Sequence, residues 1–322
     1  MYKIIVDMRL PGECWQHFTD CEVIGPENPS FTREEFLEKA RGCDAAVVLY
    51  NNVDDELLDA LPSLKAVTSF GAGYDYIDVD ACTRHGVVAC HIPDSVREPT
   101  AEYTIALLLA TVRTIPWRDR QLRENPGYSW QMALYPSWIA MGKTLGIVGM
   151  GRIGSSVARR AAALDMTVVY YDPHRLSPEE EEKLDIVFMP LDELLKAADI
   201  VTLHVPLTPE TTGMIGAREL ALMKPTAHLI NMARGPVVDE DALLDALEQK
   251  RIAGAGIDVF KDEPHINPRF KALDNVVLTP HFATDPLDVR KIQGEHCARN
   301  LLAALRGETP PNILNPQVLD RQ

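Results

Sequence analysis

The sequence predicts an α/β fold in which helices cover parallel sheets. Short apolar runs typical of buried strands alternate with helix-length segments along nearly the whole chain, and a glycine fingerprint stands between one such run and a helix. A chain of 322 residues favours two domains, and its hydrophobic content of 46% is enough for two packed cores. No solenoid repeat or low-complexity tract is visible in the sequence.

The expected elements follow the chain in order. Before the fingerprint, strands are expected over residues 3–6, 45–50, 66–69 and 87–89. A helix is expected from Thr32, which has capping-box spacing to Glu35. After the fingerprint, strands are expected over residues 167–171, 200–204, 228–231, 255–258 and 276–278. A long apolar helix is expected over residues 98–122 and a final helix over residues 288–306.

The position of the fingerprint in the middle of the chain predicts the domain organisation. We expect two Rossmann-like lobes with a cleft between them: a doubly wound dinucleotide-binding domain of residues 99–290, and a smaller flavodoxin-like substrate domain of residues 1–98 plus 291–322. The final helix follows the last strand of the cofactor domain, so the simplest place for it is on the N-terminal domain.

The fingerprint has the spacing of a dinucleotide-binding turn, with glycines at Gly149, Gly151 and Gly154. Glycines at this spacing allow a tight turn, a close approach of backbone N–H groups to a pyrophosphate, and packing of the helix on its strand. The helix that begins at Arg152 and Ile153 adds the positive end of its dipole. The glycines lie between a strand and a helix, and a second strand ending in an acidic residue follows. This order indicates a dinucleotide-binding site much more specifically than the glycine spacing alone.

Asp172 predicts NAD rather than NADP as the cofactor. It ends the strand-like run after the fingerprint helix, where a carboxylate can accept hydrogen bonds from both ribose hydroxyls and repels a 2′-phosphate. The alternative is that Asp172-Pro173 only opens a turn. His174 and Arg175 follow closely and argue in the other direction.

Composition and charge restrict the partners. A formal net charge of −15 argues against nucleic acid or an anionic membrane as a partner, because both need a basic surface. The six cysteines have neither C-x-x-C nor zinc-site spacing, so no metal site is expected and the thiols predict a reducing compartment. With no signal-peptide layout and no apolar stretch long enough to span a bilayer, we expect a cytoplasmic protein.

Polar residues follow several expected strands and converge where a nicotinamide would lie. Arg234 follows residues 228–231, Asp258 closes the next strand with Glu263 just after it, and His281 follows the last strand. Reduction of a ketone needs a proton donor suited to neutral pH, for which His281 is the candidate. Glu263 would orient it and keep it charged, and Arg234 would hold the substrate carboxylate through its planar fork.

Each of these residues also has an ordinary structural interpretation. In this interpretation Glu263 belongs only to a solvated acidic turn, His281 caps a helix, and Arg234 forms a surface ion pair. Gly71 and Gly73 then form only a tight exit turn, although exposed N–H groups in such a turn also bind anions. The joint placement at strand ends favours the catalytic interpretation.

The chain resembles the D-isomer-specific 2-hydroxyacid dehydrogenase family. The segments that carry the resemblance span nearly the whole chain: residues 71–75, 101–102, 149–154, 205–208, 231–238, 256–260, 263–264, 279–281 and 315–316. The resemblance implies that Arg234, Glu263 and His281 form the catalytic set. It also implies that Asp258 lies near the nicotinamide carboxamide.

The same resemblance implies the binding residues and the assembly. The backbone amides of Gly71, Ala72 and Gly73 are expected to hold the substrate carboxylate, together with Arg234. Further cofactor contacts are expected from Val205, Pro206, Thr211, Ala233, Arg234 and His281. Family members are homodimers joined through their cofactor domains, so a homodimer of this kind is expected here.

The expected activity is NAD(H)-dependent interconversion of a small 2-keto acid and the D-2-hydroxy acid. The sequence most resembles glyoxylate/hydroxypyruvate-type reductases; a D-lactate-type or sugar-acid reductase and a non-catalytic NAD(H)-sensing regulator are the alternatives. Side chains at Tyr50, Asn51 and Asn52 would decide the substrate. Two features depart from the family. Phe282 follows the histidine and is expected to reshape the pocket mouth. The bulky segment 130–141 contains Trp138, which either walls a substrate pocket or packs in a subunit interface.

Overall fold

The computed structural model describes residues 1–127 and 136–321. Their contacts form two compact units: a first unit of Met1–Val96 with the described residues from Thr284 onward, and a second unit of Arg97–Ala283. The boundary expected at residue 291 would divide the final helix α12 (Leu287–Leu305). The observed boundary lies before this helix, at Thr284. The helix stays in one unit because it packs along the first unit's sheet and against the 3₁₀ helix η1 (Gly12–Trp15).

The first unit is built on a parallel sheet with the strand order β2-β1-β3-β4-β5. These strands are β1 (Tyr2–Val6), β2 (Cys21–Ile24), β3 (Ala45–Val48), β4 (Ala66–Ser69) and β5 (Val88–Cys90). Strand β2 was not expected from the sequence. It lies at the edge of the sheet and its residues are only partly buried, so the apolar run that identifies a central strand is missing.

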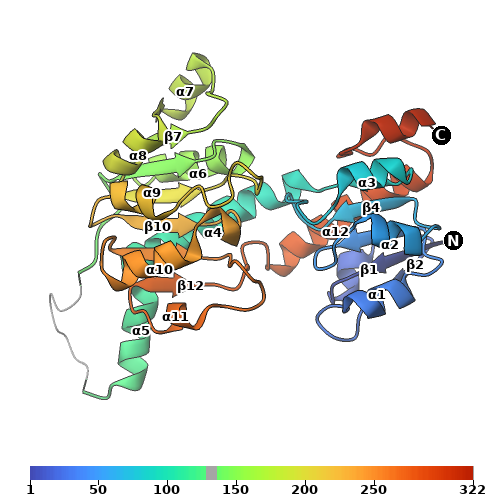
Figure 1. Ribbon diagram of the computed structural model, residues 1–322, viewed down its shortest axis with the longest axis horizontal. Helices are drawn as coiled ribbons and strands as arrows, with labels where there is room; N and C mark the ends of the chain where they lie inside the picture. Colours follow the sequence, from blue (N-terminus) through green and yellow to red (C-terminus); the bar gives the residue numbers. More distant parts are fainter. Residues whose placement is uncertain (128–135, 322) are drawn as a thin grey trace. The chain divides into compact units, whose positions relative to one another are not determined.

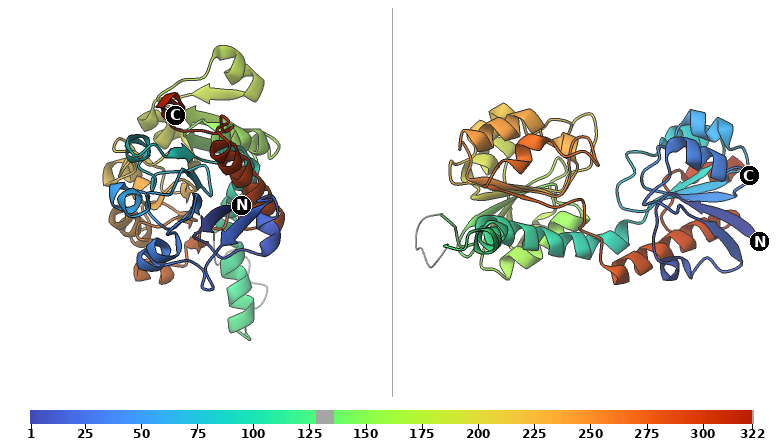
Figure 2. Two further views of the ribbon diagram at one scale, coloured as in Figure 1. Left: turned by 90° about the vertical axis from the view of Figure 1, so that its right-hand side faces the viewer. Right: turned by 90° about the horizontal axis from the view of Figure 1, so that it is seen from below.

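Alternate residues of these strands face two separate cores. Ile4 and Val6 pack toward α12, whereas Ile5 packs toward the other face. That other face is covered by α1 (Arg33–Lys39), α2 (Asp55–Ala60) and α3 (Val79–Arg84). In Figure 2 (right), α12 in red and the blue helices lie on opposite faces of the sheet. The capping box of Thr32 is confirmed. The Thr32 side chain accepts a hydrogen bond from Glu35 N, and the Glu35 side chain accepts one from Thr32 N.

The second unit contains a seven-stranded parallel sheet with the order β12-β11-β10-β9-β6-β7-β8 (Figure 1). Its strands are β6 (Thr144–Val148), β7 (Thr167–Tyr171), β8 (Ile186–Phe188), β9 (Ile200–Leu203), β10 (His228–Asn231), β11 (Gly254–Ile257) and β12 (Val276–Leu278). Its helices are α4 (Pro93–Val112, from Arg97 on), α5 (Ile115–Glu124), α6 (Arg152–Ala162), α7 (Pro178–Leu184), α8 (Leu191–Ala197), α9 (Ala217–Leu222), α10 (Glu240–Glu248) and α11 (Pro268–Lys271). This is the doubly wound fold expected from the sequence.

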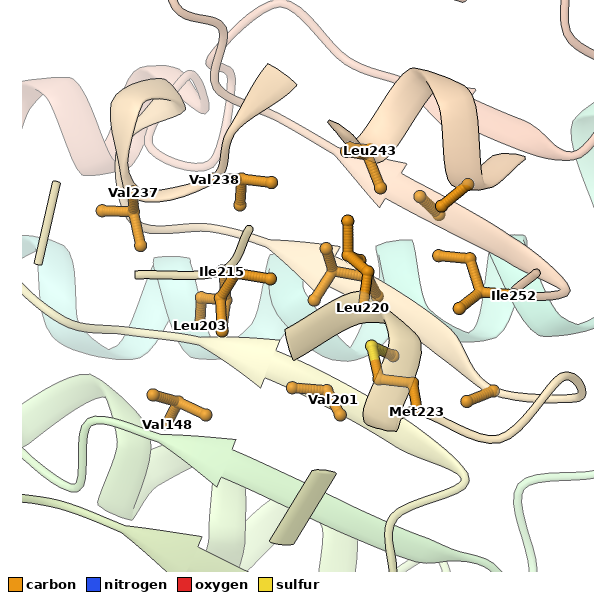
Figure 3. Close-up of a cluster of buried hydrophobic side chains, with 14 of the residues drawn as sticks. Val148, Val201, Leu203, Ile215, Leu220, Met223, Val237, Val238, Leu243 and Ile252 are labelled. Carbon is orange, nitrogen blue, oxygen red and sulfur yellow. The ribbon is translucent and has the colours of Figure 1, made fainter. Parts of the chain in front are cut away.

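Both faces of the seven-stranded sheet are covered. Val148 and Leu203 face one core with side chains of α8, α9 and α10, and Figure 3 shows this cluster from Val148 to Ile252. Ile147 and Tyr170 face the opposite core, which α4 and α6 complete. Helix α4 runs along this second face in Figure 2 (right). A parallel sheet buried on both faces fits the continuous apolar strands of the sequence.

The long helix expected over residues 98–122 is wrong in its bounds. It begins earlier, at Pro93, and it is broken into α4 and α5 after Val112. Thr114 adopts a left-handed backbone conformation with φ of 53°, which no α-helix can continue through. The chain therefore changes direction between the two helices, which the apolar pattern alone does not reveal.

Candidate functional site

The carboxyl ends of the second unit's strands form the edge at which its polar residues gather. Strand order reverses between β6 and β9, so their connections leave in opposite directions and open a crevice at their carboxyl ends. The glycine fingerprint follows β6, and the segments carrying Arg234, Glu263 and His281 follow β10, β11 and β12. The expected residues of this unit thus share one edge of one sheet.

The fingerprint turn can adopt its conformation only because of Gly149 and Gly154. Gly149 has a φ of 97°, and a Cβ there would lie 2.8 Å from the His204 carbonyl carbon. A Cβ on Gly154 would lie 2.2 Å from Gly149 O, so this glycine lets α6 pack on the turn. Gly151 caps α6 and faces open space, with Arg152 and Ile153 beginning the helix. The turn therefore fits a dinucleotide pyrophosphate at a helix N-terminus.

Asp172 follows β7 beside this turn and is anchored by two backbone amides. Its Oδ2 accepts a bond from Met150 N at 2.8 Å, and its Oδ1 accepts one from His174 N at 2.9 Å. The nearby Arg175 forms a two-pronged ion pair with Glu181, at 2.8 and 2.9 Å, and its guanidinium lies over the Phe188 ring. Asp172 thus opens a turn, as the structural alternative held, and also presents its carboxylate next to the fingerprint.

The loop after β9 forms the opposite wall of the crevice. Val205 is buried, and its amide nitrogen lies against the position of the absent Gly149 Cβ. Thr211 Oγ1 donates to Pro206 O at 2.6 Å and accepts from Thr208 N at 2.8 Å. These bonds close the loop on itself, so Val205, Pro206 and Thr211 have fixed positions beside the fingerprint turn.

The turn after β10 is shaped by Asn231, whose side chain bonds to the backbone on both sides. Its Oδ1 accepts from Ala233 N, and its Nδ2 donates to Arg234 O, each at 3.1 Å. A Cβ on Gly235 would lie 2.0 Å from the Phe260 carbonyl carbon, so only glycine allows this turn to meet the β11 exit. Sequence reasoning assigned no role to Asn231 or Gly235; the clash at Gly235 depends on tertiary contact and has no local signal.

Glu263 and His281 form a direct pair. Glu263 Oε2 lies 2.9 Å from His281 Nδ1, and Glu263 Oε1 accepts from Phe260 N at 2.9 Å. Burial would raise the pKa of Glu263, but the bond to His281, the His281 charge, the Phe260 amide and the Arg234 charge together lower it. His281 has a left-handed backbone with φ of 57°, and its N donates to Asp258 O. Its side chain bonds Glu263, so the helix-cap interpretation is wrong.

Asp258 is a buried carboxylate behind this pair. Its Oδ1 accepts from Thr279 Oγ1 at 2.6 Å and from Phe282 N at 3.1 Å. Burial raises the pKa of Asp258, against the opposing effects of these bonds and of the His281 charge. Asp258 thus fixes the segment on both sides of His281. The sequence analysis did not identify Thr279 as its partner.

The Gly71–Gly73 turn belongs to the first unit, where it follows β4. Its carbonyl groups are all occupied: Gly71 O accepts from Ile92 N, Ala72 O lies 2.9 Å from His91 Nδ1, and Gly73 O accepts from Ser69 Oγ at 2.6 Å. Within residues 1–127 and 136–321, the amides of Gly71, Ala72 and Gly73 donate no hydrogen bond. The turn therefore presents unused N–H groups, the property that an anion site requires.

Two bulky residues take different places. The Phe282 ring is exposed at the carboxyl edge of the sheet, just after His281. Trp138 packs edge-on against His228, with ring centroids 5.0 Å apart, at the amino end of β10 and so at the opposite edge from the site of its own unit. Residues 130–135 of the bulky segment lie outside the described residues. A role of Trp138 toward a neighbouring subunit stays a prediction.

The described residues contain neither a cluster of metal ligands nor a membrane-spanning helix. No cluster of three or more metal-ligating side chains occurs in the described parts of the chain. None of the described helices is both long and apolar enough to span a membrane.

Comparison with known proteins gives the family. A family model described as D-isomer specific 2-hydroxyacid dehydrogenase, NAD binding domain, matches residues 105–283. The chain belongs to the D-isomer specific 2-hydroxyacid dehydrogenase family. It is 44% identical over 301 residues to the glyoxylate reductase of Thermococcus gammatolerans, an alignment that covers 92% of this chain and 90% of that protein.

Solved structures of this dehydrogenase family are similar over almost the full length. The glyoxylate reductase from Paecilomyes thermophila has a TM-score of 0.85 at 31% identity, covering 98% of this chain and 99% of that chain. The NADPH-dependent glyoxylate/hydroxypyruvate reductase from Sinorhizobium meliloti, in complex with NADP and malonate, has a TM-score of 0.85 at 30% identity, covering 97% and 96%. The chain is thus a 2-hydroxyacid dehydrogenase, an oxidoreductase with a nicotinamide-dinucleotide domain.

Proposed function

We propose that this dehydrogenase uses NADH to reduce glyoxylate or hydroxypyruvate, giving the D-2-hydroxy acid where the product is chiral. The observation that carries the proposal is the contact of 2.9 Å between Glu263 and His281, at the same sheet edge as the dinucleotide turn. The names of the relatives from Thermococcus gammatolerans and Paecilomyes thermophila support glyoxylate as the substrate. A D-lactate-type or sugar-acid reductase is the alternative.

The proton-transfer roles follow from the Glu263–His281 geometry. Because Nδ1 of His281 faces Glu263, its Nε2 is left to donate a proton to the keto oxygen as this oxygen gains negative charge. The nicotinamide supplies the hydride when it is bound. The carbonyl π bond breaks, carbon takes the hydride and oxygen takes the His281 proton, which completes the hydroxyl. Glu263 stays ionised, since its pKa is lowered, and stabilises the charged imidazole before transfer.

Substrate orientation is assigned to Arg234 and to the Gly71–Gly73 turn. Arg234 carries a planar fork of N–H donors suited to a carboxylate and its adjacent carbonyl oxygen. Its charge lowers the pKa of Glu263, which supports its assignment to the same reaction. The unused amides of Gly71, Ala72 and Gly73 support the assignment of the substrate carboxylate to this turn.

The preference for NADH needs its own argument, because the Sinorhizobium meliloti relative is NADPH-dependent and was solved with NADP. Asp172 places a carboxylate, held by two backbone amides, at the end of β7. Arg175, the nearest candidate for binding a 2′-phosphate, is already paired with Glu181 and stacked on Phe188. A negative site with its neighbouring arginine engaged favours a ribose hydroxyl over a phosphate.

The first test is NADH oxidation, followed by near-ultraviolet absorbance, with glyoxylate, hydroxypyruvate, pyruvate, oxaloacetate, phenylpyruvate and 2-ketogluconate. Strong turnover of glyoxylate or hydroxypyruvate, with NADH well ahead of NADPH, is the expected result. Turnover restricted to pyruvate or 2-ketogluconate would favour the alternative. Tight NADH binding with no turnover of any acid would instead support a regulator.

Two variants test the cofactor assignment. Asp172→Asn removes the charge that repels a 2′-phosphate, so the preference for NADH over NADPH in kcat/KM should fall by about tenfold or more. Asp165→Asn is the matched control, because Asp165 precedes β7 at the opposite edge of the sheet. An unchanged cofactor preference in Asp172→Asn would refute the role of Asp172.

The assembly and location remain proposals as well. We infer a homodimer joined through the cofactor domain and a cytoplasmic location, with neither nucleic acid nor membrane as a partner. The family resemblance supports the first inference, and the acidic composition and cysteine usage support the others. Light scattering of the purified protein tests the dimer.

A further inference from the structure

The buried carboxylate of Asp7 holds the loop after β3 in the first unit. Asp7 directly follows β1 and its side chain is 0% exposed. Its Oδ1 accepts from Leu49 N at 2.9 Å, and its Oδ2 accepts from Leu49 N, Tyr50 N and Asn51 N at 3.0, 2.8 and 2.9 Å. No ion pair to Asp7 is found in the part of the chain that the structure describes.

These contacts fit the ionised form of Asp7. Both oxygens face N–H donors, and an ionised carboxylate is a pure acceptor. Burial raises the pKa of Asp7, while its bonds to Leu49, Asn51 and Tyr50 oppose that rise. A buried charge without a cation costs free energy that an apolar side chain would avoid. What the carboxylate provides is a fixed backbone shape over three successive residues.

The place of this loop in the sheet is where open α/β sheets bind ligands. The strand order β2-β1-β3-β4-β5 reverses between β1 and β3, and ligands bind outside the carboxyl ends of strands at such a reversal. Asp7 leaves β1 and Leu49 leaves β3 at this point. The next strand, β4, leads into the Gly71–Gly73 turn, and Phe70 N donates to Val48 O at 2.9 Å. The loop and the turn are therefore neighbours.

The far end of the loop is fixed as well. Arg33 donates to Asn52 O, and it also pairs with Asp54 at 2.6 Å. Tyr50, whose backbone N is held by Asp7, is 61% exposed at the carboxyl edge of the sheet. The loop thus has a backbone fixed from both ends and a large side chain presented outward.

We propose that Asp7 is a positioning residue that sets which 2-keto acid side chain the enzyme accepts, by fixing the backbone of Leu49, Tyr50 and Asn51. This rests on the proposed function. In a 2-keto acid, the variable side chain is attached to the carbonyl carbon next to the carboxylate. If the Gly71–Gly73 amides take the carboxylate, the neighbouring loop is the part of the first unit that meets the side chain.

The test compares Asp7→Asn and Asp7→Ser with a matched control, Asp44→Asn. The asparagine keeps the shape but turns one acceptor into a donor that faces N–H groups, and the serine covers the case in which asparagine prevents folding. Asp44 accepts from Lys3 N at 3.0 Å at the amino end of the same sheet, so its variant disturbs the sheet away from the loop.

Three quantities are measured for each protein: amide hydrogen exchange at residues 49–51, NADH affinity, and kcat and KM for glyoxylate and for phenylpyruvate. In the Asp7 variants we expect faster exchange at these amides and unchanged NADH affinity. The KM of the preferred acid should rise about tenfold or more, because small displacements of binding groups have large effects. The ratio of kcat/KM for glyoxylate to kcat/KM for phenylpyruvate should move closer to one. The kcat should fall much less than KM rises. Asp44→Asn should change neither the exchange nor the selectivity.

The outcomes separate this proposal from the function on which it rests. Faster exchange with unchanged selectivity would show that Asp7 is only structural, and unchanged exchange would show that it does not hold the loop; either overturns the proposal. Equal loss of selectivity in Asp44→Asn would also overturn it. If the unmodified protein reduces no 2-keto acid, the proposed function itself fails, and the substrate role of Asp7 fails with it.

Discussion

Replacement of Glu263 by glutamine is the sharpest test of the catalytic pair. The substitution keeps the size of the side chain and removes only its charge. The contact of 2.9 Å between Glu263 Oε2 and His281 Nδ1 places an ionised acceptor against the imidazole that donates the proton. A hydrogen bond to a charged group contributes about 1.5–3 kcal/mol, and the two side chains are 36% and 44% exposed, which favours the lower end.

That free energy sets the expected loss of rate. At about 1.4 kcal/mol for each factor of ten, kcat/KM for a 2-keto acid should fall roughly tenfold at neutral pH. His281→Ala, which removes the proton donor itself, should lose about 10²- to 10⁴-fold in kcat. NADH affinity should survive in both variants.

The assay is steady-state NADH oxidation over a range of pH, with Glu248→Gln as control. Glu248 is a surface glutamate of the same unit that pairs with Arg269. If Glu263→Gln kept full kcat/KM, the support of His281 by Glu263 would be refuted. Near-normal turnover of His281→Ala would refute its role as the acid.

Three further predictions concern stability. Gly235→Ala forces a Cβ to 2.0 Å from the Phe260 carbonyl carbon and should cost about 3 kcal/mol in urea unfolding, whereas Gly12→Ala meets open space and should cost little. The hydrogen bond from Arg160 lowers the pKa of Glu98 to about 2. Because Glu98 is 38% exposed, Glu98→Gln should lose only about 1 kcal/mol at pH 7, and this difference should vanish as the pH falls from 4.5 toward 2, where Glu98 becomes protonated in the folded protein as well. Thr279→Val leaves the buried Asp258 without its closest donor and should cost about 1–3 kcal/mol, with Thr212→Val as an exposed control. Equal unfolding free energies in a variant and its control, or a Glu98→Gln difference independent of pH, would contradict these estimates.

Much of the fold could be predicted because central parallel strands leave a clear pattern. The strands over residues 66–69, 167–171, 228–231 and 276–278 have the expected bounds, since each is a short apolar run. The edge strand β2 was not predicted, because Glu22 interrupts its apolar run. The edge strand β8 was not predicted either, although the edge strand β12 was. The break at Thr114 was not predicted from the apolar pattern, although Pro116 in the first turn of α5 is a local signal for a new helix start.

The doubly wound fold, the dinucleotide turn and the pairing of Glu263 with His281 could all be proposed before the structure was known. These depend on local spacing: glycines at a strand exit and polar residues after strands whose carboxyl ends meet at one edge. Other contacts could be seen only in the tertiary structure. The partners of Asp258, the backbone clash that requires Gly235, and the hold of Asp7 on residues 49–51 all join segments far apart in the chain. Hydrogen bonds and close contacts of that kind depend on distances of a few tenths of an ångström, which only the packing of the sheets and helices can set.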